Sequence, residues 1–418
     1  MNTTYKKNYF YAMVAFLLSP FLSAVAAFRS YRSPWAKNLF WAFCAFYGFT
    51  FAIGTESQGS DIMRYITQLQ DLYEVDMTFT KAVDYFAYSG EVDILRTLIA
   101  VTLSRFTDNP AILTLIYGII FGFFFSRNLW YVMERLEGKI LPVTILLLAC
   151  FFLVNPIWKI NGFRMWTAAH IFIYGLLPYL CEGKKRGIWI ACSSILVHFA
   201  FLVPILLLLG YIFLGNRLTL YFFFFISTFF ISGVNMTVFN YYTEDYMPEV
   251  VQERTSSYRT DSAVSKMSTP SSSQRVWYAR WYRTALEWSL SGFLIILYWK
   301  NRKFIQSHKS WLSLVSFTLL LFAAANILRF IPSGGRYLTL AYLCALPLCI
   351  FYVQNIAREK MLKRYLYLAA PALFLFAIVS LRIGFYSLSA TSILGNPLIA
   401  LFTAGENYSL NDFIRMLL

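Results

Sequence analysis

The chain has 418 residues, of which 58% are hydrophobic and 14% charged, and its formal net charge is +15. Apolar runs of roughly 16–24 residues recur along its whole length, as bilayer-spanning helices require. This composition excludes a soluble globular fold and predicts an all-α, polytopic integral membrane protein with a single transmembrane domain over 1–418. The basic residues fall mainly in short connections between apolar runs. This pattern sets the orientation of a membrane protein and is not typical of nucleic-acid binding. No nucleic-acid partner is therefore expected.

Twelve apolar segments are predicted to cross the membrane as helices. In chain order they are 9–28, 38–53, 110–131, 140–156, 162–181, 187–200, 201–214, 218–235, 284–300, 311–331, 336–356 and 365–388. The first segment has basic residues on both sides, so its orientation stays open. Small residues at 23–27 near its end resemble a signal-peptide cleavage site, whereas the basic residues just beyond favour a retained helix.

Four short basic connections set the orientation, because such loops stay on the cytoplasmic side. They contain Lys184–Arg186; Lys300, Arg302, Lys303 and Lys309; Arg358, Lys360, Lys363 and Arg364; and Arg127, Arg135 and Lys139. With these four inside, the loops 54–109 and 236–283 and the tail after residue 389 lie outside. The stretch 187–214 must then cross twice although each half is short, and Pro204 and His198 favour a break within it.

The two outer loops differ in character. The segment 91–106 is amphipathic and carries Arg96 and Arg105, so it is predicted to lie along the outer interface as a helix and not to cross. The segment 255–275 is rich in Ser and Thr and polar enough to be mobile. Two interpretations of it stay open, a lid over a site and a plain flexible connection.

Four basic side chains lie near the outer ends of apolar segments: Arg164, His198, Arg329 and Arg336. Each alone could reach the lipid headgroups as helix-end cations commonly do. As a group they are unexpected, since outer positions are normally depleted of positive charge. They predict a site for an anionic lipid-linked substrate.

Arginine is well suited to such a substrate because its planar fork donates two parallel hydrogen bonds to phosphoryl oxygens. Arg280 and Arg283, where the large outer loop enters the next span, join the predicted pyrophosphate-binding set, although Arg283 and Glu287 are one turn apart and could simply pair. The sequence contains no DxD, HExxH or Cys/His constellation, so neither a metal ion nor a cofactor is expected. Several arginines can stabilise a pyrophosphate leaving group instead.

Two further polar residues have alternative interpretations. Asp61, in the outer motif 59–65, is either a general base toward a sugar hydroxyl or the N-cap of the helix that follows. His170, about two turns deeper than Arg164 on the same predicted helix, is either an interior histidine or a catalytic one.

Several short motifs together resemble one known family. They are Gly59-Ser60-Asp61-x-x-x-Tyr65, Asn161-Gly162-Phe163-Arg164-Met165-Trp166-Thr167-Ala168, His198-Phe199 and Gly335-Arg336-Tyr337. Their order resembles the EpsG-like branch of the Wzy polysaccharide polymerases over roughly residues 50–350. Met165 departs from the family, in which many members carry a polar residue after the arginine, and this puts a side-chain amide role at that position in doubt.

The resemblance implies a metal-independent, GT-C-like glycosyltransferase in the bacterial inner membrane, with its active site facing the periplasm. Such enzymes build O-antigen or capsule by transferring a glycan from undecaprenyl pyrophosphate to the non-reducing end of another lipid-linked repeat unit. Their partners are these lipid-linked donors and acceptors, membrane lipids, a flippase and a chain-length regulator. By this resemblance Arg164 and Arg336 hold the pyrophosphate, and His198 and Asp61 activate or orient the acceptor hydroxyl. Neighbouring motif residues are Arg64, Tyr65, Asn161 and Tyr337.

Three other functions stay open. A flippase or transporter of the same lipid-linked units would place its charges along a central cavity and show internal symmetry. An O-antigen ligase-like transferase would share the donor and differ in the acceptor. An acyltransferase of the outer leaflet would need a buried histidine such as His170.

Overall fold

The computed structural model describes residues 3–52, 60–75, 78–88, 93–233, 276–356, 360–403 and 408–417, together with 241, 245 and 252. Within these residues the secondary structure is helical and no β-strand forms. One isolated antiparallel bridge joins Ser389 and Ser409. The predicted all-α class is therefore confirmed.

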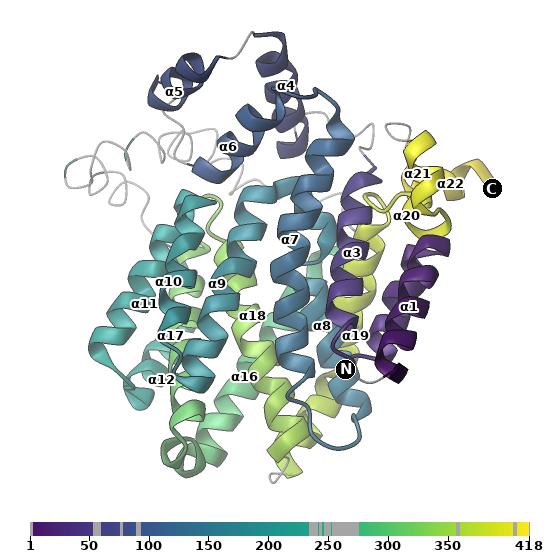
Figure 1. Ribbon diagram of the computed structural model, residues 1–418. Coiled ribbons are helices and arrows are strands. Elements are labelled where there is room, and N and C mark those ends of the chain that lie inside the picture. The colour runs from purple at the N-terminus through teal and green to yellow at the C-terminus, as the bar shows by residue number, and fades with distance from the viewer. Residues whose placement is uncertain are drawn as a thin grey trace.

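The helices form one upright bundle with smaller helices at one end (Figure 1). The bundle contains α1 (Thr3–Leu18), α2 (Pro20–Arg29), α3 (Ala36–Phe49), α7 (Pro110–Met133), α8 (Pro142–Val154), α9 (Phe163–Glu182), α10 (Arg186–Ser193), α11 (Leu202–Leu214), α12 (Leu218–Ser227), α16 (Trp277–Ser307), α17 (Lys309–Leu328), α18 (Arg336–Phe351) and α19 (Lys360–Gly384). At one end lie α4 (Asp61–Glu74), α5 (Phe79–Tyr88), α6 (Ile94–Leu103), α20 (Ala390–Leu394), α21 (Pro397–Phe402) and α22 (Leu410–Leu417). We call this the α4–α6 end.

The length and apolarity of the helices suit a bilayer. Five helical stretches in the described residues are long and apolar enough to cross a membrane: Pro110–Met133, Pro142–Glu182, Lys309–Leu328, Arg336–Ile356 and Lys360–Gly384. The second contains both α8 and α9, joined by the 3₁₀ helix η2 (Ile157–Gly162). Large apolar side chains such as Phe213 and Leu368 are exposed on the outside of the bundle, as lipid contact requires. The remaining predicted spans coincide with shorter helices or, for 284–300, with α16.

The prediction of a single helix over 9–28 is wrong. The structure has two helices there, α1 and α2, which meet at Ser19 and Pro20. Proline removes a backbone donor and is best tolerated in the first turn of a helix, so Pro20 ends one helix and begins the next. Ser19 Oγ caps α2 by accepting from the Leu22 N–H at 3.3 Å.

The predicted boundaries of both outer loops also change. In 54–109 the predicted interfacial helix is present as α6, and the helix expected to follow Asp61 is present as α4. The helix α5 is a further one that the sequence analysis missed. The predicted loop 236–283 ends earlier, because α16 begins at Trp277 and carries Arg280 and Arg283 on its first turns. The segment 255–275 and Gly59 lie outside the described residues.

The helices α9 and α10 form a tight antiparallel hairpin. A Cβ added at Gly175 would lie 2.3 Å from the Gly187 carbonyl oxygen, and one at Gly187 would lie 2.2 Å from the Gly175 carbonyl oxygen. The two backbones therefore touch, as small residues allow in membrane helices. Because Arg164 precedes Gly175 by as many residues as His198 follows Gly187, this register brings the two cationic positions to the same level.

The predicted break within 187–214 is confirmed. After α10 the chain forms two short 3₁₀ turns, Ser194–Leu196 and Phe199–Phe201, and α11 then begins at Leu202. His198 lies between the turns in an extended conformation (φ −152°, ψ 118°). Pro204 sits in the first turn of α11, where its missing N–H costs no helical hydrogen bond.

We expect Gly175→Ala to lower the thermal stability of the purified protein, while Gly210→Ala leaves it unchanged or raises it. The new methyl group at 175 meets backbone that cannot rotate away, and such overpacking costs about 1–3 kcal/mol. Gly210 is also inside a helix, but a Cβ there meets nothing within 4 Å, so alanine adds only its better helix propensity. Melting temperatures in detergent compare the two variants. Equal melting temperatures would contradict the proposed backbone contact.

The opposite end of the bundle is fastened by an amide clasp, which we define as Gln354 and Asn355 on the π-helix Tyr352–Ile356. Gln354 Nε2 donates to the carbonyl oxygens of Glu137 and Lys139 at 2.5 and 3.0 Å, and its Oε1 accepts from the Leu141 N–H at 3.2 Å. Asn355 accepts from the Glu137 N–H at 3.1 Å. The clasp holds the connection between α7 and α8 beside the start of the connection to α19.

A third basic connection joins the same end, because Arg135 forms an ion pair with Glu182 at the end of α9. Three of the four basic connections used to set the orientation thus lie together, away from α4–α6.

Candidate functional site

A buried carboxylate, Asp93, organises the α4–α6 end. It precedes α6 at the N-cap position, and 4% of the residue is exposed. Arg164 Nη1 donates to its Oδ2 at 2.6 Å, and the Phe199 N–H donates to its Oδ1 at 2.8 Å. His198 Nδ1 lies 3.3 Å from both carboxylate oxygens. Two residues predicted for the site, Arg164 and His198, are therefore brought together by a third that the sequence analysis missed.

Asp93 is held ionised by its partners and fixes which ring nitrogen of His198 faces it. Burial by itself raises the pKa of the Asp93 carboxyl, but the hydrogen bond and charge of His198, the charge of Arg164 and the Phe199 N–H together hold that pKa well below its usual range. An ionised carboxylate only accepts hydrogen bonds, so the proton of a neutral imidazole sits on Nδ1 and Nε2 keeps its lone pair. A histidine that a carboxylate orients in this way can act as a general base.

Arg164 uses only part of its guanidinium for structural contacts. Besides the bond to Asp93, its Nε donates to the Tyr65 hydroxyl at 2.9 Å, and its guanidinium carbon lies 5.5 Å from the centre of the Tyr65 ring. These are two of the five N–H groups of an arginine. Its side chain is 23% exposed. The remaining donors can therefore serve an anionic ligand at the surface of the cluster.

We call Asp93, His198, Arg164 and Tyr65 the dyad group. The guanidinium carbon of buried Arg96 also lies 5.1 Å from the centre of the Tyr65 ring. Tyr65 is thus the aromatic residue to which two arginines are anchored.

The other predicted residues of the outer motif dock α4. Asp61 is the first residue of α4 and pairs with Arg64, while Ser60 occupies the N-cap position that the capping hypothesis assigned to Asp61. Asn161 Oδ1 accepts from the Ile62 N–H at 3.4 Å, which ties α4 to η2. The Asp61 carboxylate lies near Gly162, with Oδ2 3.7 Å from where a Cβ would stand. Among the described residues, its ion-pair partner is Arg64 and not a member of the dyad group.

A second group, also missed by the sequence analysis, surrounds Lys159 in η2. Lys159 Nζ donates to the Val154 carbonyl oxygen at 2.9 Å and lies 3.8 Å from the centre of the Trp166 ring. With Arg283, whose charge acts on it, and Tyr342 it lines a small cavity of about 60 Å³. We call this the basic cavity. Its lining contains no carboxylate among the described residues.

The predicted cations of α16 and α17 separate into different roles. Arg283 does not pair with Glu287, and its Nε instead donates to the Tyr282 hydroxyl at 2.8 Å. Glu287 accepts from Arg329 Nη1 at 2.6 Å. Arg329 is therefore neutralised, whereas Arg283 keeps its charge for the basic cavity. Arg280 is exposed and lies over the Trp281 ring at 5.9 Å.

The helix α18 lies beside both groups. Tyr337 donates from its hydroxyl to the Ala200 carbonyl oxygen at 2.7 Å, two residues beyond His198. Thr339 and Tyr342, farther along the same helix, line the basic cavity. Arg336 begins α18, is half-buried, and forms no ion pair with the described residues. Its helix thus connects the dyad group with the basic cavity.

His170 is a satisfied interior residue. Its Nε2 lies 2.9 Å from the Asn155 carbonyl oxygen and its Nδ1 lies 3.2 Å from Asn128 Nδ2. It is 1% exposed and packs against the rings of Phe121 and Phe125. Both ring nitrogens are engaged, so the interior interpretation holds and the acyltransferase hypothesis loses its candidate base.

Within the described ranges, no group of three or more His, Cys, Asp or Glu side chains could hold a metal ion. The ligands offered at the α4–α6 end are instead guanidinium and ammonium groups beside an oriented imidazole. Such a set can bind phosphoryl oxygens and accept a proton.

Comparisons of this chain with protein-family models, with curated proteins and with solved structures found no match.

Proposed function

We propose that the chain is a membrane glycosyltransferase that polymerises lipid-linked oligosaccharide repeat units, as the Wzy-type polymerases that it resembles do. The observation that carries the proposal is the dyad group, in which Asp93 holds both an oriented histidine and an arginine at one end of an apolar helical bundle. A base and a phosphate-binding cation side by side suit group transfer from a diphosphate.

The donor in this proposal is a glycan on undecaprenyl pyrophosphate. The bond between its anomeric carbon and the pyrophosphate oxygen breaks, and a glycosidic bond forms from that carbon to a hydroxyl at the non-reducing end of a second lipid-linked unit. The hydroxyl proton passes to His198 Nε2. Undecaprenyl pyrophosphate leaves with its added negative charge stabilised by arginine, and it takes up no metal ion in the step.

In the proposed roles, Arg164 and Arg336 contact the pyrophosphate, and His198 is the base that Asp93 orients. Arg283 adds positive charge beside them and Lys159 adds an amine donor, and neither has a carboxylate partner in the described part of the chain. The role of Asp61 as a base is the less favoured one here, since Arg64 already neutralises it.

The setting is the bacterial inner membrane. In this proposal the bundle is GT-C-like and crosses twelve times, the basic connections are cytoplasmic, and the α4–α6 end faces the periplasm. A helix as short as α10, about 12 Å long, does not span the membrane by itself, and the 3₁₀ turns that follow it complete that crossing. The apolar bundle keeps the substrate's lipid in the membrane while its sugars reach the charged end.

A reconstitution experiment tests the function. Purified protein in liposomes receives lipid-linked repeat units that are already on the side of α4–α6, and products are resolved by chain length. We expect polymers of many units, with none from protein carrying Arg336→Ala. A flippase would move units between leaflets without joining them, and a ligase would transfer a unit only to a different acceptor. Either result overturns the polymerase proposal.

A further inference from the structure

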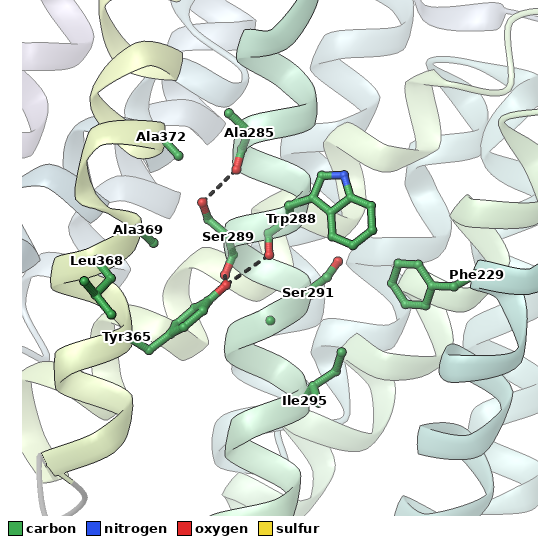
Figure 2. A pocket seen from close by; sticks show the side chains of 11 residues that line it. Phe229, Ala285, Trp288, Ser289, Ser291, Ile295, Tyr365, Leu368, Ala369 and Ala372 are labelled. Carbon is green, nitrogen blue, oxygen red and sulfur yellow. Dashed lines mark hydrogen bonds between the residues drawn. The ribbon is translucent and has the colours of Figure 1, made fainter.

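A cavity lies between α16 and α19, at the side of the bundle (Figure 2). It has a volume of about 610 Å³. Figure 2 shows Ala369 and Ala372 of α19 on one side, the helix α16 with Ala285 in the middle, and Phe229 on the other. This size falls in the usual range of ligand pockets. We call it the seam groove.

The seam groove offers a hydrocarbon surface. Its polar groups are mostly engaged within the protein: Ser289 Oγ donates to the Ala285 carbonyl oxygen at 2.7 Å, and the Tyr365 hydroxyl lies 3.1 Å from the carbonyl oxygens of residues 288 and 289. Among the lining hydroxyls described, that of Ser291 has no partner. A ligand in this groove therefore gains from burial of apolar area and not from polar recognition.

Small side chains keep the groove open. A Cβ at Gly292 would lie 2.1 Å from the Tyr365 hydroxyl, so glycine at this position leaves room for the Tyr365 side chain. Alanines at 285, 369 and 372 leave the space unfilled. The rims are large and outward-facing, with Trp288 62% and Leu368 82% exposed. The groove is thus open to the lipid side of the bundle.

The seam groove continues toward the basic cavity. On α16 its residues extend at helical spacing from Ile295 to Ala285, and the next residue on that stripe, Tyr282, lines the basic cavity. On α19 the same progression passes from Ala372 to Phe376, which also lines the basic cavity. The Tyr282 and Phe376 rings, which both line the basic cavity, stack on each other with centroids 6.0 Å apart and planes at 17°.

The two cavities together have the polarity of one amphiphile. The Arg283 guanidinium and the Lys159 amine stand at the α4–α6 end without a carboxylate in the described lining. Apolar surface follows on α16 from Ile295 to Ala285, eleven residues that span about 15 Å along the helix axis. This length is about half of the hydrocarbon thickness of a bilayer, or one leaflet.

We infer that the seam between α16 and α19 binds the hydrocarbon chain of a long prenyl phosphate, with the phosphate at Lys159 and Arg283. The identity of this lipid as the carrier of the sugar units rests on the proposed function. The binding itself does not. An anionic head and an apolar chain match the two cavities in order, and the cations have no competing carboxylate there.

The test is a binding measurement on the full-length protein in nanodiscs of phosphatidylcholine. The probes are undecaprenyl phosphate and the short-chain geranyl phosphate. We expect the long chain to bind more tightly, because each buried methylene adds to affinity. Lys159→Met weakens binding of both probes about tenfold to a hundredfold, since each loses a charge-assisted hydrogen bond. Ala372→Phe fills the groove and weakens only the long chain, by about tenfold or more.

Two matched variants serve as controls. Ala370→Phe adds the same ring on the same helix at a half-buried position that does not line the groove, and Arg382→Met removes an exposed cation at the end of α19 that lines neither cavity. Both should bind the probes as the wild type does. Equal effects of Ala372→Phe and Ala370→Phe would overturn the inference. So would displacement of undecaprenyl phosphate by an equal amount of phosphatidylglycerol, which would mean ordinary boundary lipid.

The outcome is separable from that of the polymerase proposal. If undecaprenyl phosphate binds with the expected pattern but no polymer forms in liposomes, the groove stands and the proposed function fails. If polymer forms equally well with Ala372→Phe and binding is unchanged, the function stands and the groove does not.

Discussion

Asp93→Asn should lower the rate of polymer formation by on the order of 10²–10⁴-fold, the usual contribution of general acid–base catalysis. Asparagine keeps the shape and can still accept from the Phe199 N–H, but it carries no charge. His198 then loses the group that fixes its tautomer and stabilises the protonated ring, while Arg164 loses its ion-pair partner. Polymer formed by purified protein in liposomes, measured against time, gives the rate.

The matched control is Asp412→Asn at the start of α22. That carboxylate also accepts a hydrogen bond, from Ser409 at 2.6 Å, and touches no member of the dyad group. Its rate should equal that of the wild type. A wild-type rate for Asp93→Asn would show that the Asp93 carboxylate takes no part in the reaction. Melting temperatures show that each variant is folded.

The pH dependence of stability checks the same carboxylate independently of activity. A carboxyl whose pKa is lower in the folded chain stabilises the fold fully above its unfolded pKa, about 3.9 for Asp, and this contribution is lost as the pH falls through the folded value. Because the pKa of Asp93 is lowered, the excess in melting temperature of the wild type over Asp93→Asn should persist from pH 7 to roughly pH 5. It should shrink only in stronger acid. A difference that vanishes already at pH 5 would show that Asp93 is not held ionised as its partners require.

Arg164→Ala should abolish long polymer and cause single repeat units to accumulate, with a rate loss of about 10²–10³-fold. The guanidinium has donors left for phosphoryl oxygens after its bonds to Asp93 and Tyr65. Arg164→Lys keeps the charge and the ion pair but loses the planar fork, so its activity should lie between the two. The chain-length distribution of products, in cells or in liposomes, is the measurement.

Arg105→Ala provides the comparison, because Arg105 is an exposed cation just beyond α6 at the same end of the bundle. It should leave the distribution of chain lengths unchanged. Normal chain lengths in both Arg164 variants would contradict the assignment of the pyrophosphate to this arginine. A loss in Arg164→Ala that Arg164→Lys fully restores would mean that charge alone matters there.

The sequence predicted the helical segments well because long apolar runs have one stable form in a membrane. The segments 110–131 and 311–331 correspond closely to α7 and α17. The interruption at His198 was also predictable, from polar residues and a proline within an apolar stretch. The division of 9–28 was missed, because hydropathy is averaged over many residues and is little changed by one serine and one proline. In the backbone, however, Ser19 and Pro20 end one helix and begin the next.

The site was predictable only in part. Arg164 and His198 stood out because positive charge is rare at outer helix ends. Asp93 gave no such signal, since an acidic residue before an apolar helix in an outer loop is ordinary, and its partner His198 is 105 positions away. Lys159 was missed because it lies in the short 3₁₀ helix between α8 and α9, a connection that the apolar pattern of the sequence does not describe. The only local indication was a lysine beside aromatic residues between two apolar runs.

The amide clasp also bears on how this protein matures as it is synthesised. The Leu141 N–H donates to the side chain of Gln354, which is 213 positions later in the chain and is therefore synthesised much later. Until the ribosome has delivered α18, the connection between α7 and α8 must keep its backbone groups hydrated. The hydrogen bonds at that end of the bundle therefore form late in synthesis. A chain truncated before residue 354 would lack them, and its α7–α8 connection would be exposed to quality-control proteases.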